Sequence, residues 1–200
     1  MRNGDVQQAQ GRGNGAPTGY ARGLGALVRT LGVGIGRRER PGLFGLARID
    51  DVLMPVDEAL ARLAANGKIV GDVDFRGCPS LTSLPGGLQV GGWLFLAGCA
   101  SLAGLPDGLV VGGNLYLSDV QSLASLPVGL KIGGDIYLRR CTSLASLPEG
   151  LEVGRGLYLN GCTSLTSLPE GLEVGGRIIG ADLLPRKPSR TRSPDTGMTR

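Results

Sequence analysis

Four cysteines are the residues of this chain whose type and spacing first suggest chemistry. They are Cys78, Cys99, Cys141 and Cys162, and they recur at multiples of 21 residues. In a stacked repeat this spacing gives each thiol at most two cysteine neighbours, which is too few for a four-donor metal site. Val120 occupies the skipped position without disturbing the residues around it. We therefore favour buried thiols that pack as small apolar groups over a disulfide or a reactive thiol.

Four glutamates are the second candidate group, because paired carboxylates can perform acid–base catalysis. Glu149, Glu152, Glu170 and Glu173 also recur at 21 residues, so a solvated acidic face is the better interpretation. The chain contains no histidine, which excludes His-ligated zinc and Ser-His-Asp or Cys-His catalysis. Its Gly-Gly pairs lack the lysine and hydroxyl residues of a phosphate-binding loop. We expect no enzymatic activity, no catalytic residues, no metal and no cofactor.

The repeat that sets these spacings runs through five units without slipping. Its consensus is V-G-G-x-L-Y-L-x-x-C-x-S-L-x-S-L-P-x-G-L-x. The triplet Leu157-Tyr158-Leu159 alternates with period two and predicts a short strand. Pro169 prevents the following segment from becoming a long helix, and the Gly-Gly pair provides a corner. Because one unit cannot bury its own leucines, we expect the units to stack as a repeat solenoid with a parallel sheet.

These motifs resemble a known family. The segment LYLNGCTSLTSLP, residues 157–169, looks like a leucine-rich repeat. The short unit with Leu-Pro is similar to the repeats of secreted bacterial effectors, and C-x-S-L-x-S-L-P resembles repeats of plant immune receptors. The resemblance covers about residues 69–180 and implies a leucine-rich repeat horseshoe, with the parallel β-sheet on its concave face and short irregular segments on its convex side. The spacing between Val153 and Leu157 departs from the family, so another Gly-rich β-solenoid is the alternative.

A helix is expected directly before the repeats. In the segment PVDEALARLAANGK, residues 55–68, Leu60 and Leu63 lie on one apolar face, and Gly67 suits a helix end. Repeat arrays need closed ends. We therefore assign residues 49–68 to a helical N-terminal cap, which the resemblance to bacterial effectors also implies.

Basic ends flank an acidic body. Residues 1–48 carry eight Arg against two acidic residues, residues 186–200 carry five Lys or Arg against one Asp, and the intervening part has an acidic excess. Their composition predicts disorder for the head, 1–48, and the tail, 183–200. Residues 69–182 are assigned to the solenoid of five full units and a partial one. We interpret the basic ends as solubilising segments rather than as nucleic-acid or membrane-surface binders.

The outward side chains of the predicted strands form the candidate partner-binding site. The middle residues of successive triplets make one aromatic ladder, and the rows beside it vary from unit to unit, which suits recognition of a partner. The alternative is that the stacked rings only stabilise the sheet. The residues assigned to partner binding are Trp93, Phe95, Asn114, Tyr116, Asp135, Tyr137, Arg139, Tyr158 and Asn160.

The sequence thus predicts a non-catalytic module that binds an unidentified protein through this sheet. One alternative is a structural solenoid that self-associates through unpaired edges. The alternative that we favour least is binding of nucleic acid or a membrane surface through the basic termini. No run reaches the roughly 18 apolar residues of a membrane helix, and the start lacks a signal-peptide core. We expect a cytoplasmic protein, or one exported without a conventional signal; the resemblance to effectors implies action in a host cell.

Overall fold

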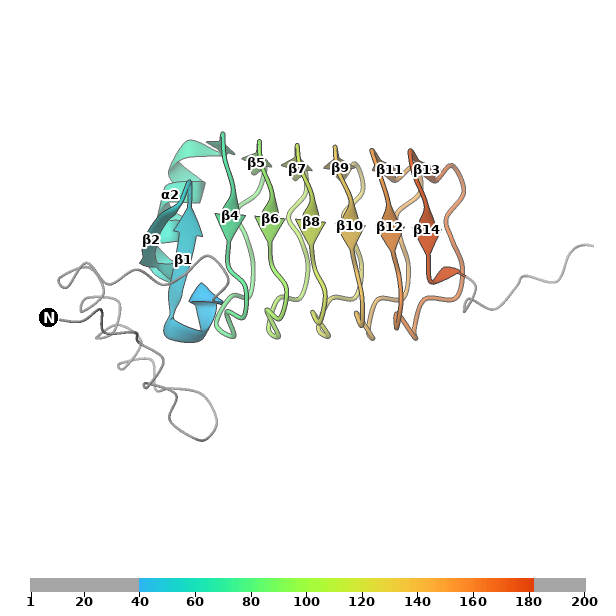
Figure 1. Cartoon of the computed structure of the whole chain (residues 1–200), viewed down its shortest axis with the longest axis horizontal. Coiled ribbons are helices and arrows are strands. Elements are labelled where there is room, and N and C mark those ends of the chain that lie inside the picture. Colours follow the sequence, from blue (N-terminus) through green and yellow to red (C-terminus); the bar gives the residue numbers. More distant parts are fainter. Residues whose placement is uncertain (1–39, 182–200) are drawn as a thin grey trace, which may run out of the picture.

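The chain folds as a parallel β-solenoid, which the computed structural model describes for residues 40–181 (Figure 1). Successive turns stack side by side along one axis, and equivalent residues pair in register. Ile136 lies opposite Leu157, and Leu157 lies opposite Ile178, so each turn takes 21 residues. The prediction of a repeat solenoid with a parallel sheet is therefore confirmed. The predicted disorder of residues 1–39 and 183–200 concerns segments outside the described residues.

Each turn contributes one two-residue strand to each of two sheets. The parallel strands of the first, sheet A, are β4 (Val73–Asp74), β6 (Leu94–Phe95), β8 (Leu115–Tyr116), β10 (Ile136–Tyr137), β12 (Leu157–Tyr158) and β14 (Ile178–Ile179). Those of the second, sheet B, are β3 (Lys68–Ile69), β5 (Gln89–Val90), β7 (Val110–Val111), β9 (Lys131–Ile132), β11 (Glu152–Val153) and β13 (Glu173–Val174). Sheet B was not predicted, because each of its strands repeats a single apolar residue before the glycine corner, whereas the sheet A triplets repeat two.

The Gly-Gly corners join the sheet B strand of a turn to its sheet A strand. The Gly133 N–H donates to the carbonyl of Val111, and the Gly134 N–H donates to the carbonyl of Gly113, at 2.9 and 3.0 Å. A Cβ added at Gly133 would come closer than 3.0 Å to the carbonyl oxygen of Gly112. Glycine is thus required here by the close approach of neighbouring turns, and not by a left-handed backbone.

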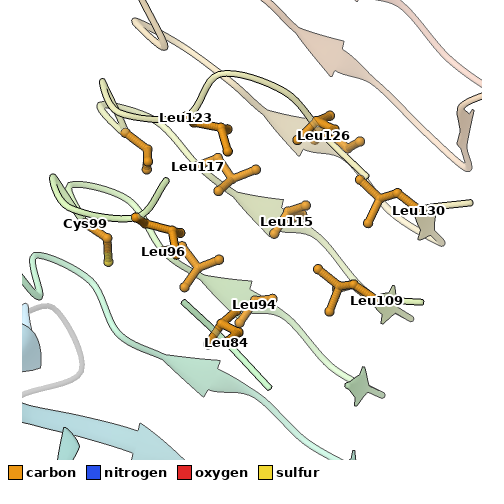
Figure 2. Close-up of a cluster of buried hydrophobic side chains, with 14 of the residues drawn as sticks. Leu84, Leu94, Leu96, Cys99, Leu109, Leu115, Leu117, Leu123, Leu126 and Leu130 are labelled. Atoms are coloured by element: carbon orange, nitrogen blue, oxygen red, sulfur yellow. The ribbon is translucent and has the colours of Figure 1, made fainter. Parts of the chain in front are cut away.

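The core is a column of aliphatic side chains enclosed by the turns (Figure 2). Leu94, Leu96, Leu115 and Leu117 come from adjacent turns of sheet A and are fully buried. Each such side chain contributes about 1.5–3 kcal/mol through removal from water. Because every turn supplies the same residues at the same phase, the column is continuous along the solenoid.

A helix precedes the first turn, as predicted. The helix α2 (Val56–Asn66) buries Ala59 and Leu63 and ends at Gly67, whose φ of 62° is left-handed. It contacts β3 and two further strands, β1 (Leu46–Ile49) and β2 (Val52–Pro55).

An antiparallel hairpin that was not predicted extends sheet A beyond β4. Strands β1 (Leu46–Ile49) and β2 (Val52–Pro55) are joined by Asp50 and Asp51, both with positive φ, as a two-residue hairpin turn of type I′ requires. Strand β1 also pairs antiparallel with β4. The 3-10 helix η2 (Pro41–Phe44) precedes the hairpin, so residues 41–48, which were assigned to the head, instead form part of the fold. Residues 49–55, which were assigned to the helical cap, lie in the hairpin and not in a helix.

Candidate functional site

The aromatic ladder is the central feature of sheet A. Phe95, Tyr116, Tyr137 and Tyr158 stack with ring centroids 4.7, 4.7 and 4.6 Å apart and interplanar angles of 11, 2 and 13°. This spacing is that of adjacent strands, about 4.8 Å. All four side chains are half-buried. Because each inner ring covers the faces of its neighbours, the ladder presents ring edges and hydroxyl groups rather than ring faces.

Two of the tyrosine hydroxyl groups form hydrogen bonds with side chains of the neighbouring row. The Asn114 side-chain amide donates to the Tyr116 hydroxyl at 3.1 Å, and the Tyr137 hydroxyl donates to Asp135 at 3.5 Å. Burial, the charge of Asp135 and the adjacent tyrosines raise the pKa of Tyr137 to about 12. Tyr137 therefore remains a neutral hydrogen-bonding phenol at physiological pH.

Trp93 extends the aromatic surface beside the ladder. Its ring meets Phe95 edge-on at 5.9 Å and Tyr116 at 6.4 Å, with interplanar angles of 80 and 69°. Trp93 is 46% exposed, whereas the four ladder residues are half-buried. It is consequently the aromatic side chain of this surface with the most area available to a partner.

Asn114 and Asp135, which are also predicted to contact a partner, bond to the next turn. The Asn114 Oδ1 accepts from the backbone N–H of Asp135 at 2.8 Å, and the Asp135 Oδ1 accepts from the N–H of Gly156 at 2.7 Å. One turn earlier in the same row, the Asp72 Oδ1 accepts from the N–H of Trp93 at 2.8 Å. The side chains of this row thus link successive turns. The sequence signal that could have predicted these links is an Asp or Asn directly before a sheet A strand.

The row after the ladder contains the remaining two predicted residues. Arg139 is exposed and Asn160 is half-buried, and they follow Tyr137 and Tyr158 at the next outward position of each strand. Sheet A thus brings Trp93, the ladder, Arg139 and Asn160 to one face.

A charged cluster that the sequence did not predict continues the ladder toward the hairpin. Asp74 lies opposite Phe95 in the strand register, is 5% exposed, and forms an ion pair with Arg76 at 2.7 Å. Arg48 approaches the same carboxylate at 3.7 Å, and the Arg76 guanidinium lies 5.0 Å from the centre of the Phe95 ring. The hydrogen bonds that Arg76 donates to the Asp74 carboxylate raise the pKa of Arg76 above its usual value.

This cluster lines a small pocket next to Trp93. The pocket has a volume of about 180 Å³ and is lined by Arg48, Asp51, Asp72, Asp74, Arg76, Trp93 and Phe95.

The four cysteines are buried free thiols, as predicted. The Sγ of Cys99 donates to the carbonyl of Phe75 in the preceding turn at 3.1 Å, and the Sγ of Cys141 donates to the carbonyl of Leu117 at the same distance. Burial raises the pKa of both thiols to about 12. A protonated, enclosed thiol is a poor nucleophile, so these residues are structural.

An open groove of about 840 Å³ runs along sheet B across β7, β9, β11 and β13. Lys131 lies opposite Glu152, which in turn lies opposite Glu173. With Glu149 and Glu170 these glutamates are exposed, in agreement with the predicted acidic face. Within residues 40–181 no three Asp, Glu or Cys side chains are grouped as metal ligands would be.

No family model, curated protein or solved structure matches this chain. The function is therefore argued from the geometry of the faces described above. In the part of the chain that the structure describes, no helix combines the length and apolar character that crossing a bilayer requires.

Proposed function

We propose that this protein is a non-catalytic module that binds another protein across the aromatic face of sheet A. The aromatic face consists of Trp93, the ladder residues Phe95, Tyr116, Tyr137 and Tyr158, and the flanking Arg139 and Asn160. The observation that carries the proposal is the exposed Trp93 ring set edge-on against a continuous stack of rings. Tyr, Trp and Arg are the residues most enriched among binding hot spots.

Pre-organisation supports this role. The ladder rings are held at fixed spacing by strands that pair in register, and Asn114 and Asp135 lock adjacent turns together. Side chains that are already ordered lose little conformational entropy when a partner binds. In this proposal Trp93 and Arg139 supply most of the contact energy, while the stacked tyrosines supply a rigid polar edge.

The leucine-rich repeat interpretation belongs to the same proposal. It is supported by the in-phase leucine column and by thiols that bond to the carbonyl groups of the preceding turn. A capping role for α2 is supported by its contacts with β1, β2 and β3. In a horseshoe of this kind the strand face is concave and receives the partner. We propose that the partner is cytoplasmic, in the cell of origin or in a host.

A binding experiment with the full chain tests the proposal. The wild type and the variants Trp93→Ala and Arg139→Glu are immobilised and exposed to lysates of the source cell and of a candidate host. We expect a protein that the wild type retains and both variants lose at least roughly tenfold, since hot-spot truncations cost 2 kcal/mol or more.

The matched control is Val128→Ala, which truncates a side chain that is 78% exposed and is not part of the aromatic face. It should bind like the wild type. Circular dichroism establishes that each variant is folded. Equal retention of every bound protein by all four forms would refute the role of the aromatic face.

A further inference from the structure

The C-terminal end of the described solenoid is open. Strands β13 and β14 are the last strands of sheets B and A, and each has a single neighbour. Ile178 and Ile179 are each 37% exposed, whereas Leu157 and Ile136, which are equivalent to Ile178 in the two preceding turns, are fully buried. At Ile178 the end therefore exposes an apolar side chain that the inner turns cover, whereas Ile179 continues the outward position of Tyr137 and Tyr158.

Main-chain groups are also directed out of this end. The N–H of Ile136 donates to the carbonyl of Gly156 and the N–H of Leu157 donates to the carbonyl of Arg177, each one turn ahead at 2.9 Å. In a parallel ladder, a residue whose N–H bonds to the next strand also directs its carbonyl to that strand, where the carbonyl accepts a second hydrogen bond. By this register both the N–H and the carbonyl of Ile178 face outward, and no further turn follows within the described residues.

Sheet B ends in the same way. The carbonyl groups of Leu151 and Val153 accept from Glu173 and Gly175 in the next turn, at 3.0 and 2.9 Å. The equivalent carbonyl groups of the last described turn belong to Leu172 and Val174, whose side chains are only half-buried.

The opposite end of the solenoid does not match this surface. There sheet A finishes in the antiparallel hairpin of β1 and β2, and α2 packs against β3 of sheet B. Head-to-tail stacking of copies would need two open edges at each end. It is consequently disfavoured, which argues against an open filament.

We propose that the open ends of two copies pair, with β14 antiparallel to β14 of the second copy around a two-fold axis at Ile178. A residue whose N–H and carbonyl both face the edge can exchange both hydrogen bonds with its own symmetry mate. Edge strands that remain monomeric usually carry a charge or proline within the strand. Here the strand is Ile178-Ile179, bounded by Arg177 and Gly180.

A second copy satisfies this end better than a single peptide segment does. A segment adds one strand to the edge, whereas the end of another copy also brings a matching apolar surface around its own Ile178. The resulting dimer would continue sheet A across the axis and carry two aromatic faces. Its formation does not depend on the binding function proposed above.

Sedimentation of the full-length protein over a range of concentrations tests the dimer. We expect a monomer–dimer equilibrium that ends at the dimer. The double variant Ile178→Lys, Ile179→Lys should weaken association at least roughly 100-fold, because like charges would face each other across the axis. The matched control, Val128→Lys, adds a charge at a 78% exposed position away from the end and should dimerise like the wild type.

Hydrogen exchange of the wild type locates the contact without any variant. The amide of Ile178 should exchange more slowly as the dimer forms, while amides of the hairpin remain unchanged. A monomer at all concentrations would overturn the proposal, as would particles larger than a dimer. Association that is insensitive to the double variant, or protection at another surface only, would overturn it too.

Discussion

The Oδ1 of Asn114 accepts a hydrogen bond from the backbone N–H of Asp135, which lies 21 residues later in the chain, at 2.8 Å. The same Asn114 side chain donates to the Tyr116 hydroxyl two residues away. One side chain thus joins two turns and orients a ladder ring. A row that varies in sequence is therefore partly structural.

Replacing Asn114 by alanine should lower the free energy of unfolding by about 1–3 kcal/mol, since it leaves a partly buried backbone N–H without its acceptor. Urea denaturation followed by the fluorescence of Trp93, the single tryptophan, measures this change. Lys131→Ala, at an exposed position of sheet B, serves as control and should change the midpoint little. Equal midpoints for the two variants would mean that the Asn114 bond contributes nothing.

Alanine at Gly133 should destabilise the protein, whereas alanine at Gly86 should not. A Cβ at Gly133 would overlap the carbonyl oxygen of Gly112, while a Cβ at Gly86 would meet nothing within 4 Å. We expect Gly133→Ala to cost about 1–3 kcal/mol or more through overpacking. Gly86→Ala should be neutral or stabilising by about 0.4–1 kcal/mol, because it reduces the entropy of the unfolded chain. Thermal unfolding of both variants distinguishes close approach from a general need for flexibility.

The buried thiols should make stability fall at alkaline pH. The pKa values of Cys99 and Cys141 are about 12 in the fold against an ordinary value of 9.0. Between these values the unfolded chain releases thiol protons that the folded chain retains, so the free energy of unfolding decreases as pH rises above about 9. Tyr137, whose pKa is also raised, acts in the same direction at higher pH.

The double variant Cys99→Val, Cys141→Val should flatten this pH dependence between 9 and 10 without unfolding the protein. Val120 already occupies the equivalent position of one turn and is fully buried. Urea midpoints at pH 7, 9 and 10 provide the measurement. An unchanged slope in the variant would assign the alkaline sensitivity to other groups.

Asp74 and Asp119 both pair with arginine, but only Asp74 should matter for stability. Asp74 is buried and is shared by Arg48 and Arg76. Asp119 pairs with Arg140, whose side chain is 67% exposed. Asp74→Ala should cost about 3–5 kcal/mol, as expected when one member of a buried ion pair is removed.

Asp119→Ala should cost at most about 1 kcal/mol, since exposed pairs are weak and screened by salt. Chemical denaturation at low and high ionic strength tests the contrast. Similar losses in the two variants would contradict the assigned difference in burial.

Much of the architecture could be predicted because the same residue types recur at the same position of each 21-residue unit. The 21-residue period of Leu157, Tyr158 and Cys162 predicted the solenoid, the strand at each triplet, the aromatic ladder and the buried thiols. These features depend on residue types that recur at the same position of every unit, so they can be recognised without knowing which residues they contact. The helix before the repeats was equally visible, since its pattern is local.

What the sequence by itself determined, then, is the period, the inward and outward faces of each sheet A strand and the composition of the core. Only the tertiary structure decided the second strand of each turn, the links made by Asn114 and Asp135, and the cluster around Asp74. Each of these includes a contact between residues about one turn or more apart, such as that of Arg48 with Asp74. The physical reason is that such hydrogen bonds and ion pairs form only after stacking has set the register, so the residues that make them carry little local signal.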